Sequence, residues 1–522
     1  TGPDGLEQRQ NFRIAVRPAA NPVAERRQFA IVAGETLRLP DPGQDGFGED
    51  AVVSVTVGGG DVDSAGLLAM LDRFPYGCAE QTVSRALPLL YANDVAERIG
   101  LVADGDVPER INAAIDRLLS YQGSTGGFGL WAPGNDLWLT AYVMDFLSRA
   151  REAGYEVSDT AFEQGLNRLQ SVLSFIGNIE GERSGEIAYA TYVLARNGRA
   201  AIGDLRYFAQ DQLEKFPTAL ARAQLAASLS FTGDQSLADG LFARALEAPS
   251  QRPGRLDYGT PLRDAAAIVT LAAESRAPQR TLAQLTRRVT AAATDAGERA
   301  YSTQEAAWLV LSANAAADTT GVAMVNGEEV GAPGTRAFDA AAMASGVSVQ
   351  NVGQETLAIA ATVTGTPLAP LPRVSNGLTI TRSFHGLDGE EIDPSRVAQN
   401  TRIVVRLTVR KTRNAAMRIM LTDLLPAGFE VENPRLLSSA DAAGVPMVQD
   451  GAEPEYREFR DDRFAAAWTL DQASDRPMTV SYMVRAISPG TFTLPAAEVV
   501  DMYQPAHVAR TEAGTLSVVP TR

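Results

Sequence analysis

Cysteine and histidine are scarce in this chain, whose 522 residues include one cysteine and two histidines. A single cysteine excludes an internal disulfide, and so few histidines exclude a Cys/His zinc cluster of the usual spacing. Long apolar runs are also missing, since no stretch approaches the roughly 20 residues that a membrane span needs. Residues 1–5 lack the basic and apolar segments of a signal peptide. We therefore expect any export signal or membrane anchor to lie outside this chain.

Positive charge is in deficit as well. Lys and Arg number 47 against 63 Asp and Glu, which gives a net charge of −16 at pH 7. A negative field opposes binding to nucleic acid and to anionic membrane surfaces, so neither is expected as a direct partner. Apolar residues make up 45% of the chain, enough for ordinary cores. Because single cores stop growing near about 250 to 300 residues, we expect several domains.

The order of strand and helix signals predicts a helical insert within a β-domain. Short β-branched runs occupy residues 1–60 and return in residues 318–372, where Asn326-Gly327 is a typical hairpin turn. Between them, residues 61–317 contain about eleven helical segments, and a capping box is expected at Thr160 and Glu163. Residues 373–522 alternate with period two, as in a β-sandwich of immunoglobulin size. Four glycines are expected to end helices: Gly100, Gly154, Gly198 and Gly233.

The only cysteine lies three residues before a glutamine, in the segment Phe74-Pro-Tyr-Gly-Cys-Ala-Glu-Gln81. A tight backbone turn can bring the sulfur to the glutamine carboxamide, and Gly77 would allow the close approach. Sulfur would then displace ammonia and leave a thioester, which is an activated acyl group because a thiolate is a good leaving group. The alternative is a small buried hydrophobic cysteine.

The motif and several other segments resemble one protein family. Cys-x-Glu-Gln is the thioester motif of alpha-2-macroglobulins and complement proteins, and Tyr76-Gly-Cys-Ala-Glu-Gln-Thr82 resembles the bacterial alpha-2-macroglobulins; the animal form usually has glycine where Ala79 stands. Residues 126–131, 258–264 and 301–304 resemble parts of the family's thioester domain, in the same order. Residues 424–430, 458–462 and 501–503 resemble parts of its last domain.

This resemblance implies a multidomain α plus β fold. An α/α-toroid thioester domain would be inserted in a small β-domain of the CUB type and followed by a macroglobulin-type β-sandwich. It also implies a broad-spectrum protease inhibitor, not an enzyme, without a cofactor or metal. After cleavage of a bait region, which is not recognisable here, an amine of the protease would attack the thioester. The full-length protein would be a periplasmic monomer, tethered to the inner membrane by a lipid.

The resemblance also assigns candidate site residues. Cys78 and Gln81 would form the thioester, in a motif expected at a domain surface. Met502 and Tyr503 would be the lock that covers it, although Tyr503 could instead end an ordinary strand. Glu80 would give acid-base help or be a solvated charge. Tyr76 and Gly77 would support the motif.

Two further expectations concern histidine. Some complement relatives use a toroid histidine to pass the acyl group to hydroxyls, but His385 and His507 both fall in the last domain. We therefore expect direct attack by amines, with Asn135 or Asp136 near the position of that histidine. His507 is expected to be a surface-loop residue without an assigned role.

Three other functions remain as alternatives. A complement-like protein that tags or adheres to surfaces would use the same chemistry. A cysteine hydrolase would need Cys78 paired with a distant histidine. A carbohydrate- or isoprenoid-processing toroid would need paired acids, and the pair Asp461-Asp462 lies in the predicted sandwich. The tryptophans Trp131, Trp138 and Trp308 are expected in the core.

Overall fold

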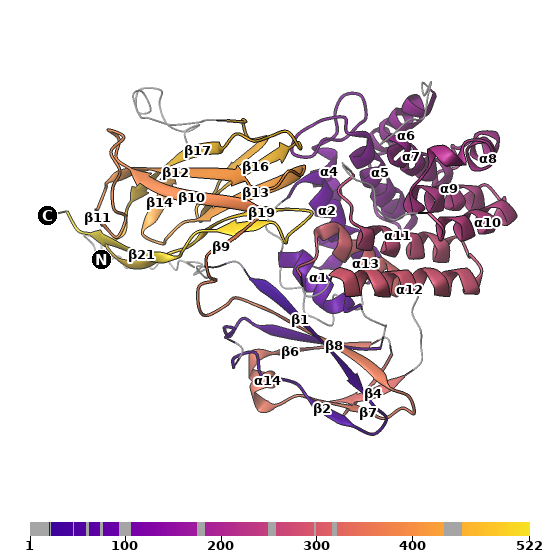
Figure 1. Ribbon diagram of the computed structural model, residues 1–522, viewed down its shortest axis with the longest axis horizontal. Helices are drawn as coiled ribbons and strands as arrows, with labels where there is room; N and C mark the ends of the chain where they lie inside the picture. Colours follow the sequence, from indigo (N-terminus) through magenta and orange to yellow (C-terminus); the bar gives the residue numbers. More distant parts are fainter. Residues whose placement is uncertain are drawn as a thin grey trace, which may run out of the picture.

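The computed structural model shows three parts: a small β-unit, a helical domain and a C-terminal β-sandwich (Figure 1). The described residues are 20, 22–44, 46–58, 62–73, 77–92, 106–174, 183–248, 257–296, 299–315, 321–332, 334–432 and 451–521. The expected mixed fold, with a helical domain and β-sandwich sheets, is confirmed. Within these residues, no helix combines the length and apolarity that crossing a membrane requires.

The β-unit is built from two stretches of chain on either side of the helices. The first gives β1 (Val23–Ile31), β2 (Thr36–Arg38) and β3 (Val52–Val57). The second gives β4 (Val322–Val325), β5 (Glu328–Gly331), β6 (Gly334–Asp339), α14 (Ala340–Ser345), β7 (Ser348–Asn351) and β8 (Leu357–Gly365). The sheets have the orders β1-β8-β3-β6 and β2-β7-β4-β5, so each combines strands from both stretches. The helical domain is therefore an insert in one β-unit.

Sequence patterns in the β-unit explain its local structure. Val53, Val55 and Val57 of β3 are buried in a core shared with the second sheet. The hairpin turn predicted at Asn326-Gly327 is confirmed, because both residues have positive φ (52° and 84°) and join the antiparallel strands β4 and β5.

The helical domain follows β3. Its elements are α1 (Ser64–Arg73), α2 (Ala79–Ala86), the short 3-10 helix η1 (Pro88–Leu90), α4 (Val107–Leu119), α5 (Leu137–Glu152), α6 (Asp159–Ser174), α7 (Arg183–Arg196), α8 (Ile202–Gln210), the 3-10 helix η3 (Leu213–Lys215), α9 (Ala219–Phe231), α10 (Gln235–Ala245), α11 (Pro261–Glu274), α12 (Gln279–Ala296) and α13 (Thr303–Ala315).

Half of these helices form a closed inner ring. Contacts run from α2 to α5, α7, α9, α11 and α13, and α13 meets α2 again. The inner helices α5, α7, α9, α11 and α13 are buried along almost their whole length, whereas α4, α6, α10 and α12 bury one face only. Helices that are apolar on all sides belong inside and amphipathic helices outside, which explains the two layers of this toroid.

Three of the four predicted helix ends are confirmed. Gly154, Gly198 and Gly233 follow α5, α7 and α9 with φ values of 91°, 68° and 89°, a conformation that glycine adopts at little cost. Gly100 lies outside the described residues. The predicted capping box was wrong: Thr160 lies inside α6, and Ser158 Oγ accepts the Ala161 N–H at 3.5 Å instead.

The C-terminal sandwich contains β9 (Val374–Asn376), β10 (Leu378–His385), β11 (Arg396–Ala398), β12 (Arg402–Lys411), β13 (Met417–Leu424), β14 (Phe429–Glu432), β15 (Tyr456–Phe459), β16 (Arg463–Leu470), β17 (Met478–Ala486), β18 (Gly490–Leu494), β19 (Ala497–Asp501), β20 (Val508–Arg510) and β21 (Gly514–Val519). The main sheets have the orders β10-β12-β17-β14 and β15-β16-β13-β19-β20-β9, and β11-β21-β18 forms a third sheet. Phe464, Trp468 and Tyr482 are buried in the core between them.

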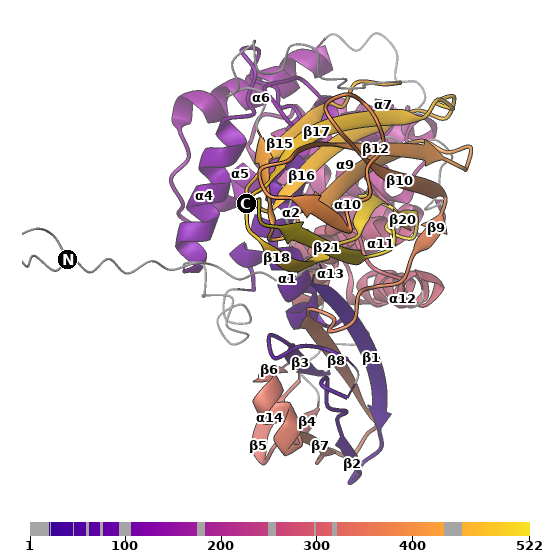
Figure 2. The ribbon, with the colours of Figure 1, turned by 90° about the vertical axis from the view of Figure 1, so that its left-hand side faces the viewer.

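One face of the sandwich packs against the helical domain (Figures 1 and 2). Strand β16 alternates between inward Phe464 and Trp468 and outward Ala465 and Ala467, and the two outward alanines join the core of the helical domain. Their small side chains allow the two domains to approach closely. This packing places the turn between β19 and β20 against the N-terminus of α2.

Candidate functional site

Cys78 and Gln81 meet at the N-terminus of α2, on the inner ring. Cys78 is the N-cap residue, with an extended backbone (φ −65°, ψ 162°), and its Sγ accepts the Gln81 backbone N–H at 3.4 Å. Both side chains are 0% exposed. Cysteine is not among the preferred N-cap residues, so its use here fits a chemical purpose better than a structural one. The structure thus brings together the two residues that we expected to form a bond.

The segment before Cys78 is held by Arg117 of α4 and by Tyr121, which follows α4 in the chain. The Gly77 carbonyl accepts hydrogen bonds from Arg117 Nε and Tyr121 Oη, both at 2.8 Å. A Cβ at Gly77 would overlap the Arg117 guanidinium, which explains the glycine. Tyr76, the expected local shield, lies outside the described residues.

Glu80 is buried among donors from α2 and α13. Its Oε1 accepts from Ser84 Oγ at 2.5 Å, from Gln304 Nε2 at 2.9 Å and from Thr303 Oγ1 at 3.1 Å. Because Glu80 is 0% exposed, the interpretation as a solvated charge was wrong. Burial raises the pKa of Glu80, while these hydrogen bonds oppose the rise. Glu80 therefore joins the first turn of α2 to the first turn of α13.

The site suppresses ionisation of the thiol. Burial raises the pKa of Cys78, and the neighbouring charge of Glu80 raises it further, although the hydrogen bond from the Gln81 backbone N–H opposes the rise. A buried neutral sulfur that is screened from water is a poor nucleophile toward outside reagents. The same exclusion of water would protect an acyl group on this sulfur from hydrolysis.

Met502 and Tyr503 cover the pair from the sandwich side. Gln81 Nε2 lies 3.6 Å from Met502 Sδ and donates a hydrogen bond to it. Met502 and Tyr503 are 1% and 5% exposed, and both belong to the core of the helical domain. Among the described residues, Gln81 Oε1 and Tyr503 Oη have no hydrogen-bond partner, so the surroundings of the carboxamide are largely apolar. The motif thus lies where the toroid meets the sandwich, which agrees with the expected position at a domain surface.

The turn that carries the lock is braced by Asp501, the last residue of β19. Asp501 Oδ1 accepts the backbone N–H groups of Tyr503 (3.0 Å) and Gln504 (3.3 Å). His507 Nδ1 lies 3.7 Å from Asp501 Oδ2, and Arg413 Nη1 lies 3.2 Å from His507 Nε2. His507 is 8% exposed, so the prediction of a surface-loop histidine was wrong. His507 is thus buried beside Asp501, the residue whose carboxylate binds the backbone of the lock turn.

Two contacts beside the lock were missed from the sequence. The Tyr258 ring meets Tyr503 edge-on, with centroids 5.0 Å apart, and the guanidinium carbon of Arg418 on β13 lies 3.9 Å from the Tyr258 ring centroid. Tyr258 Oη donates to Asp136 Oδ2 at 3.2 Å. The resemblance over residues 258–264 was the only sequence signal for Tyr258, and the strand pattern around Arg418 contained none.

The remaining candidates are accounted for by local structure. Asp136 caps α5 and accepts the Leu139 N–H at 2.9 Å, while Asn135 Oδ1 accepts from Arg168 Nε at 2.6 Å. His385 Nε2 lies 2.8 Å from Ser383 Oγ within the sandwich, and neither histidine contacts Cys78. The structure therefore offers no Cys/His pair of the kind that a cysteine hydrolase needs.

The tryptophans divide between core and interface. Trp138 and Trp308 are each 4% exposed and lie in the core of the helical domain, as predicted. Trp131 is only partly buried and stacks on Tyr456 of the sandwich, with centroids 4.2 Å apart and planes at 18°. Its assignment to the core was wrong, because it packs across the domain boundary. Among the described residues, no group of three His, Cys, Asp or Glu side chains could hold a metal ion.

Fold and site together define a macroglobulin-type protein, in which a toroid inserted in a β-unit carries a Cys-x-Glu-Gln segment that a β-sandwich covers. Residues 54–179 match the A-macroglobulin TED domain, and residues 377–506 match the bacterial alpha-2-macroglobulin MG10 domain. The chain belongs to the bacterial alpha-2-macroglobulin family.

Individual relatives agree with this assignment. The chain is 32% identical to alpha-2-macroglobulin of Escherichia coli (strain K12), over 98% of this chain and 32% of that protein. It is similar to the crystal structure of native Escherichia coli alpha-2-macroglobulin spanning domain MG7 to the C-terminus, with a TM-score of 0.82, 30% identity, and coverage of 97% of this chain and 83% of that one. Salmonella alpha-2-macroglobulin reacted with methylamine gives a TM-score of 0.85 and 30% identity, over 99% of this chain and 35% of that one. The chain thus spans only 32% of the length of the curated Escherichia coli relative.

Proposed function

We propose that this chain is the covalent-capture part of a broad-spectrum protease inhibitor, in which Cys78 and Gln81 form an internal thioester. The observation that carries this proposal is the fully buried Cys78–Gln81 pair under Met502 and Tyr503. A thiol and a carboxamide, both shielded from water and three residues apart on one helical turn, are the two reactants that a thioester needs.

The chemistry balances without a further reactant. The Cys78 sulfur attacks the Gln81 side-chain carbonyl carbon, the C–N bond breaks, and ammonia leaves with the thiol proton. In the capture step, a target amine attacks the same carbon, an amide forms, and the sulfur leaves as the Cys78 thiol. The protein is consumed by this reaction, so it acts as an inhibitor and not as an enzyme.

Capture requires that the lock withdraw. Met502 and Tyr503 belong to the sandwich, whereas the thioester pair belongs to the toroid, so movement between the two domains would expose Gln81 to a lysine amine. Cleavage of a bait region in the longer protein is the proposed trigger, and proteases are the proposed partners.

Intact mass spectrometry with and without methylamine tests the proposal. We expect a mass lower than the sequence mass by one ammonia, and a methylamine adduct with one newly titratable thiol after treatment. A full sequence mass with no adduct in freshly folded protein would contradict it. Cys78→Ser is the matched control, since serine retains the N-cap of α2 and should give neither the ammonia loss nor the adduct.

A complement-like protein that acylates surfaces is the second candidate. We expect Asn135 or Asp136 near the position of the histidine that some complement relatives use; here Asn135 accepts from Arg168, and Asp136 caps α5 and accepts from Tyr258. No histidine in this chain lies in the toroid, so we expect amines to react and hydroxyls not to. Equal reactivity toward methylamine and glycerol would favour the surface-tagging function.

The location and oligomeric state are also proposals. We place the full-length protein in the periplasm, as a lipid-tethered monomer without direct contact between this part and the membrane. Cell fractionation of the full-length protein tests the first point, and light scattering on the purified chain tests the second. A cytoplasmic fraction or a dimeric mass would contradict them.

A further inference from the structure

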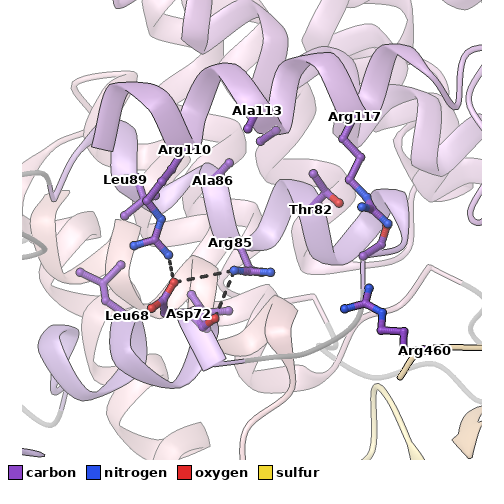
Figure 3. A pocket seen from close by; sticks show the side chains of 13 residues that line it. Leu68, Asp72, Thr82, Arg85, Ala86, Leu89, Arg110, Ala113, Arg117 and Arg460 are labelled. Atoms are coloured by element: carbon purple, nitrogen blue, oxygen red, sulfur yellow. Dashed lines mark hydrogen bonds and ion pairs between the residues drawn. The ribbon is translucent and has the colours of Figure 1, made fainter. Parts of the chain in front are cut away.

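A cationic cavity lies beside the motif. It has a volume of about 370 Å³ and is bordered by α1, α2, α4 and the turn between β15 and β16 (Figure 3). This volume is within the range of small-ligand sites, roughly 300 to 1,000 Å³. Gly77 and Thr82 on either side of the motif line one wall. The cavity therefore borders both the thioester segment and the domain boundary.

Arginine dominates the charge of this cavity. The described residues that line it include four arginines and a single carboxylate, Asp72. Asp72 is already engaged by ion pairs with Arg85 and Arg110, which Figure 3 shows together on one side. This concentration of positive charge is unusual in a chain with a net charge of −16.

The other two arginines come from different domains. Arg117 extends from α4 of the toroid and uses its Nε to hold the Gly77 carbonyl. Arg460 extends from the sandwich turn and pairs with Glu458 of its own strand at 2.7 Å. Asp72, the only carboxylate among the described lining residues, pairs with Arg85 and Arg110 and not with these two guanidinium groups.

We propose that the cavity binds a phosphate group, either as free inorganic phosphate or as the head of a small phosphate monoester, between Arg117 and Arg460. A planar guanidinium binds phosphate through two parallel N–H···O bonds, so a dianion can satisfy one arginine from each domain. The apolar floor formed by Leu68, Leu71 and Leu89 leaves space for the organic part of a monoester.

Bound phosphate would hold the toroid and the sandwich together through Arg117 and Arg460. Ligands that bind one state of an equilibrium shift it toward that state. Phosphate would therefore slow lock withdrawal and reduce the rate at which amines reach Gln81. This second consequence rests on the proposed thioester, whereas the binding itself does not.

Calorimetric titration of the chain with inorganic phosphate and with glycerol 3-phosphate, in buffers matched for ionic strength with chloride, tests the site. Arg460→Gln should weaken binding roughly tenfold, since it removes a charged, bidentate contact. Arg206→Gln is the matched control, because Arg206 is half exposed on α8 and pairs with Asp234 outside the cavity. Tighter binding of glycerol 3-phosphate would identify a monoester as the ligand, and equal binding would identify the free ion.

The methylamine rate gives a separate readout. Phosphate should slow methylamine incorporation by the wild type and leave the rate of Arg460→Gln unchanged. Absence of saturable binding, or equal binding by Arg460→Gln, would overturn the site. Binding that depends on Arg460 but does not alter the methylamine rate would overturn the bridging role. If the protein has no thioester by mass, the titration still decides the site.

Discussion

The guanidinium carbon of Arg418 lies 3.9 Å from the centre of the Tyr258 ring and joins the sandwich to the toroid beside the lock. The Arg418 carbonyl accepts the Met502 N–H at 2.9 Å, while Tyr258 packs against the Tyr503 ring. One cation–π pair thus touches both residues of the lock. The two domains are therefore in contact at the point where the proposed capture step would require them to separate.

Replacing Arg418 should loosen the lock without removing it. Arg418→Met retains an apolar stem but loses the cation over Tyr258, an interaction worth about 2 kcal/mol when desolvated. We expect methylamine to react roughly 30-fold faster, as that energy converts into an opening equilibrium. Arg396→Met, at an exposed position on β11, should react like the wild type. A rate unchanged in Arg418→Met would mean that the pair does not restrain the lock.

The Tyr503 ring and its hydroxyl have separable effects. The hydroxyl has no hydrogen-bond partner among the described residues, so Tyr503→Phe should remain as unreactive toward methylamine as the wild type. Tyr503→Ala removes a buried ring, a change that costs about 3 to 5 kcal/mol in protein cores, and should react at least 100-fold faster. If Tyr503→Phe reacted with methylamine as fast as an accelerated Tyr503→Ala, the hydroxyl and not the ring would provide the protection.

Glu80 should give the stability of the helical domain a specific pH dependence. Burial raises the pKa of Glu80 in the folded chain above its usual value of 4.5. As the pH rises past 4.5, the unfolded carboxyl loses its proton first, so the folded state binds more protons and its free energy of unfolding falls. The fall ends once the pH passes the folded pKa. Glu80→Gln removes this contribution.

Urea unfolding followed by far-ultraviolet circular dichroism measures the effect at several pH values above 4.5. Wild type should lose stability relative to Glu80→Gln as the pH rises, and Asp63, whose pKa burial also raises, contributes equally to both proteins. A wild-type advantage that grows with pH would contradict the prediction, because it would mean that the charged carboxylate is the stabilised form.

Gly77 and Arg117 should be energetically coupled. A side chain at Gly77 would overlap the Arg117 guanidinium, so Gly77→Ala must displace this flexible group from the Gly77 carbonyl, at about 1 kcal/mol in the free energy of unfolding. In an Arg117→Ala background the same substitution should cost much less, since the obstacle is gone. Additive costs in the double variant would assign the loss to the backbone conformation instead.

Local patterns were sufficient for most of the fold. Strand alternation, helical spacing and glycine at helix ends predicted a helical insert in a β-domain followed by a sandwich, because these features depend on neighbours a few residues apart; the toroid came from the family resemblance. The capping box failed for a related reason: Ser158 and Thr160 are both capable caps, and the sequence does not rank them. The motif gave Cys78 and Gln81 directly, since their separation is one helical turn.

Contacts between distant segments could not be predicted. Glu80 is buried only because Thr303 and Gln304, more than 200 residues later, supply its hydrogen bonds. His507 and Trp131 are covered by residues from other strands or from the other domain. The residues next to them in the sequence therefore do not indicate how each side chain is buried. The boundaries of the four predicted segments stay predictions, as do the roles of Met502 and Tyr503.

The interleaved order of the β-unit has a consequence for synthesis. Strand β8 pairs with β1 from Val23 to Ile31 and also with β3, yet it is translated after the entire toroid. At about 5 to 20 residues per second, the ribosome needs tens of seconds to supply it. Meanwhile the toroid, whose helices contact near neighbours in sequence, can fold, while β1 and β3 wait with open edges. A ribosome that stalls within this interval leaves a folded toroid joined to two unpaired strands, a state prone to aggregation.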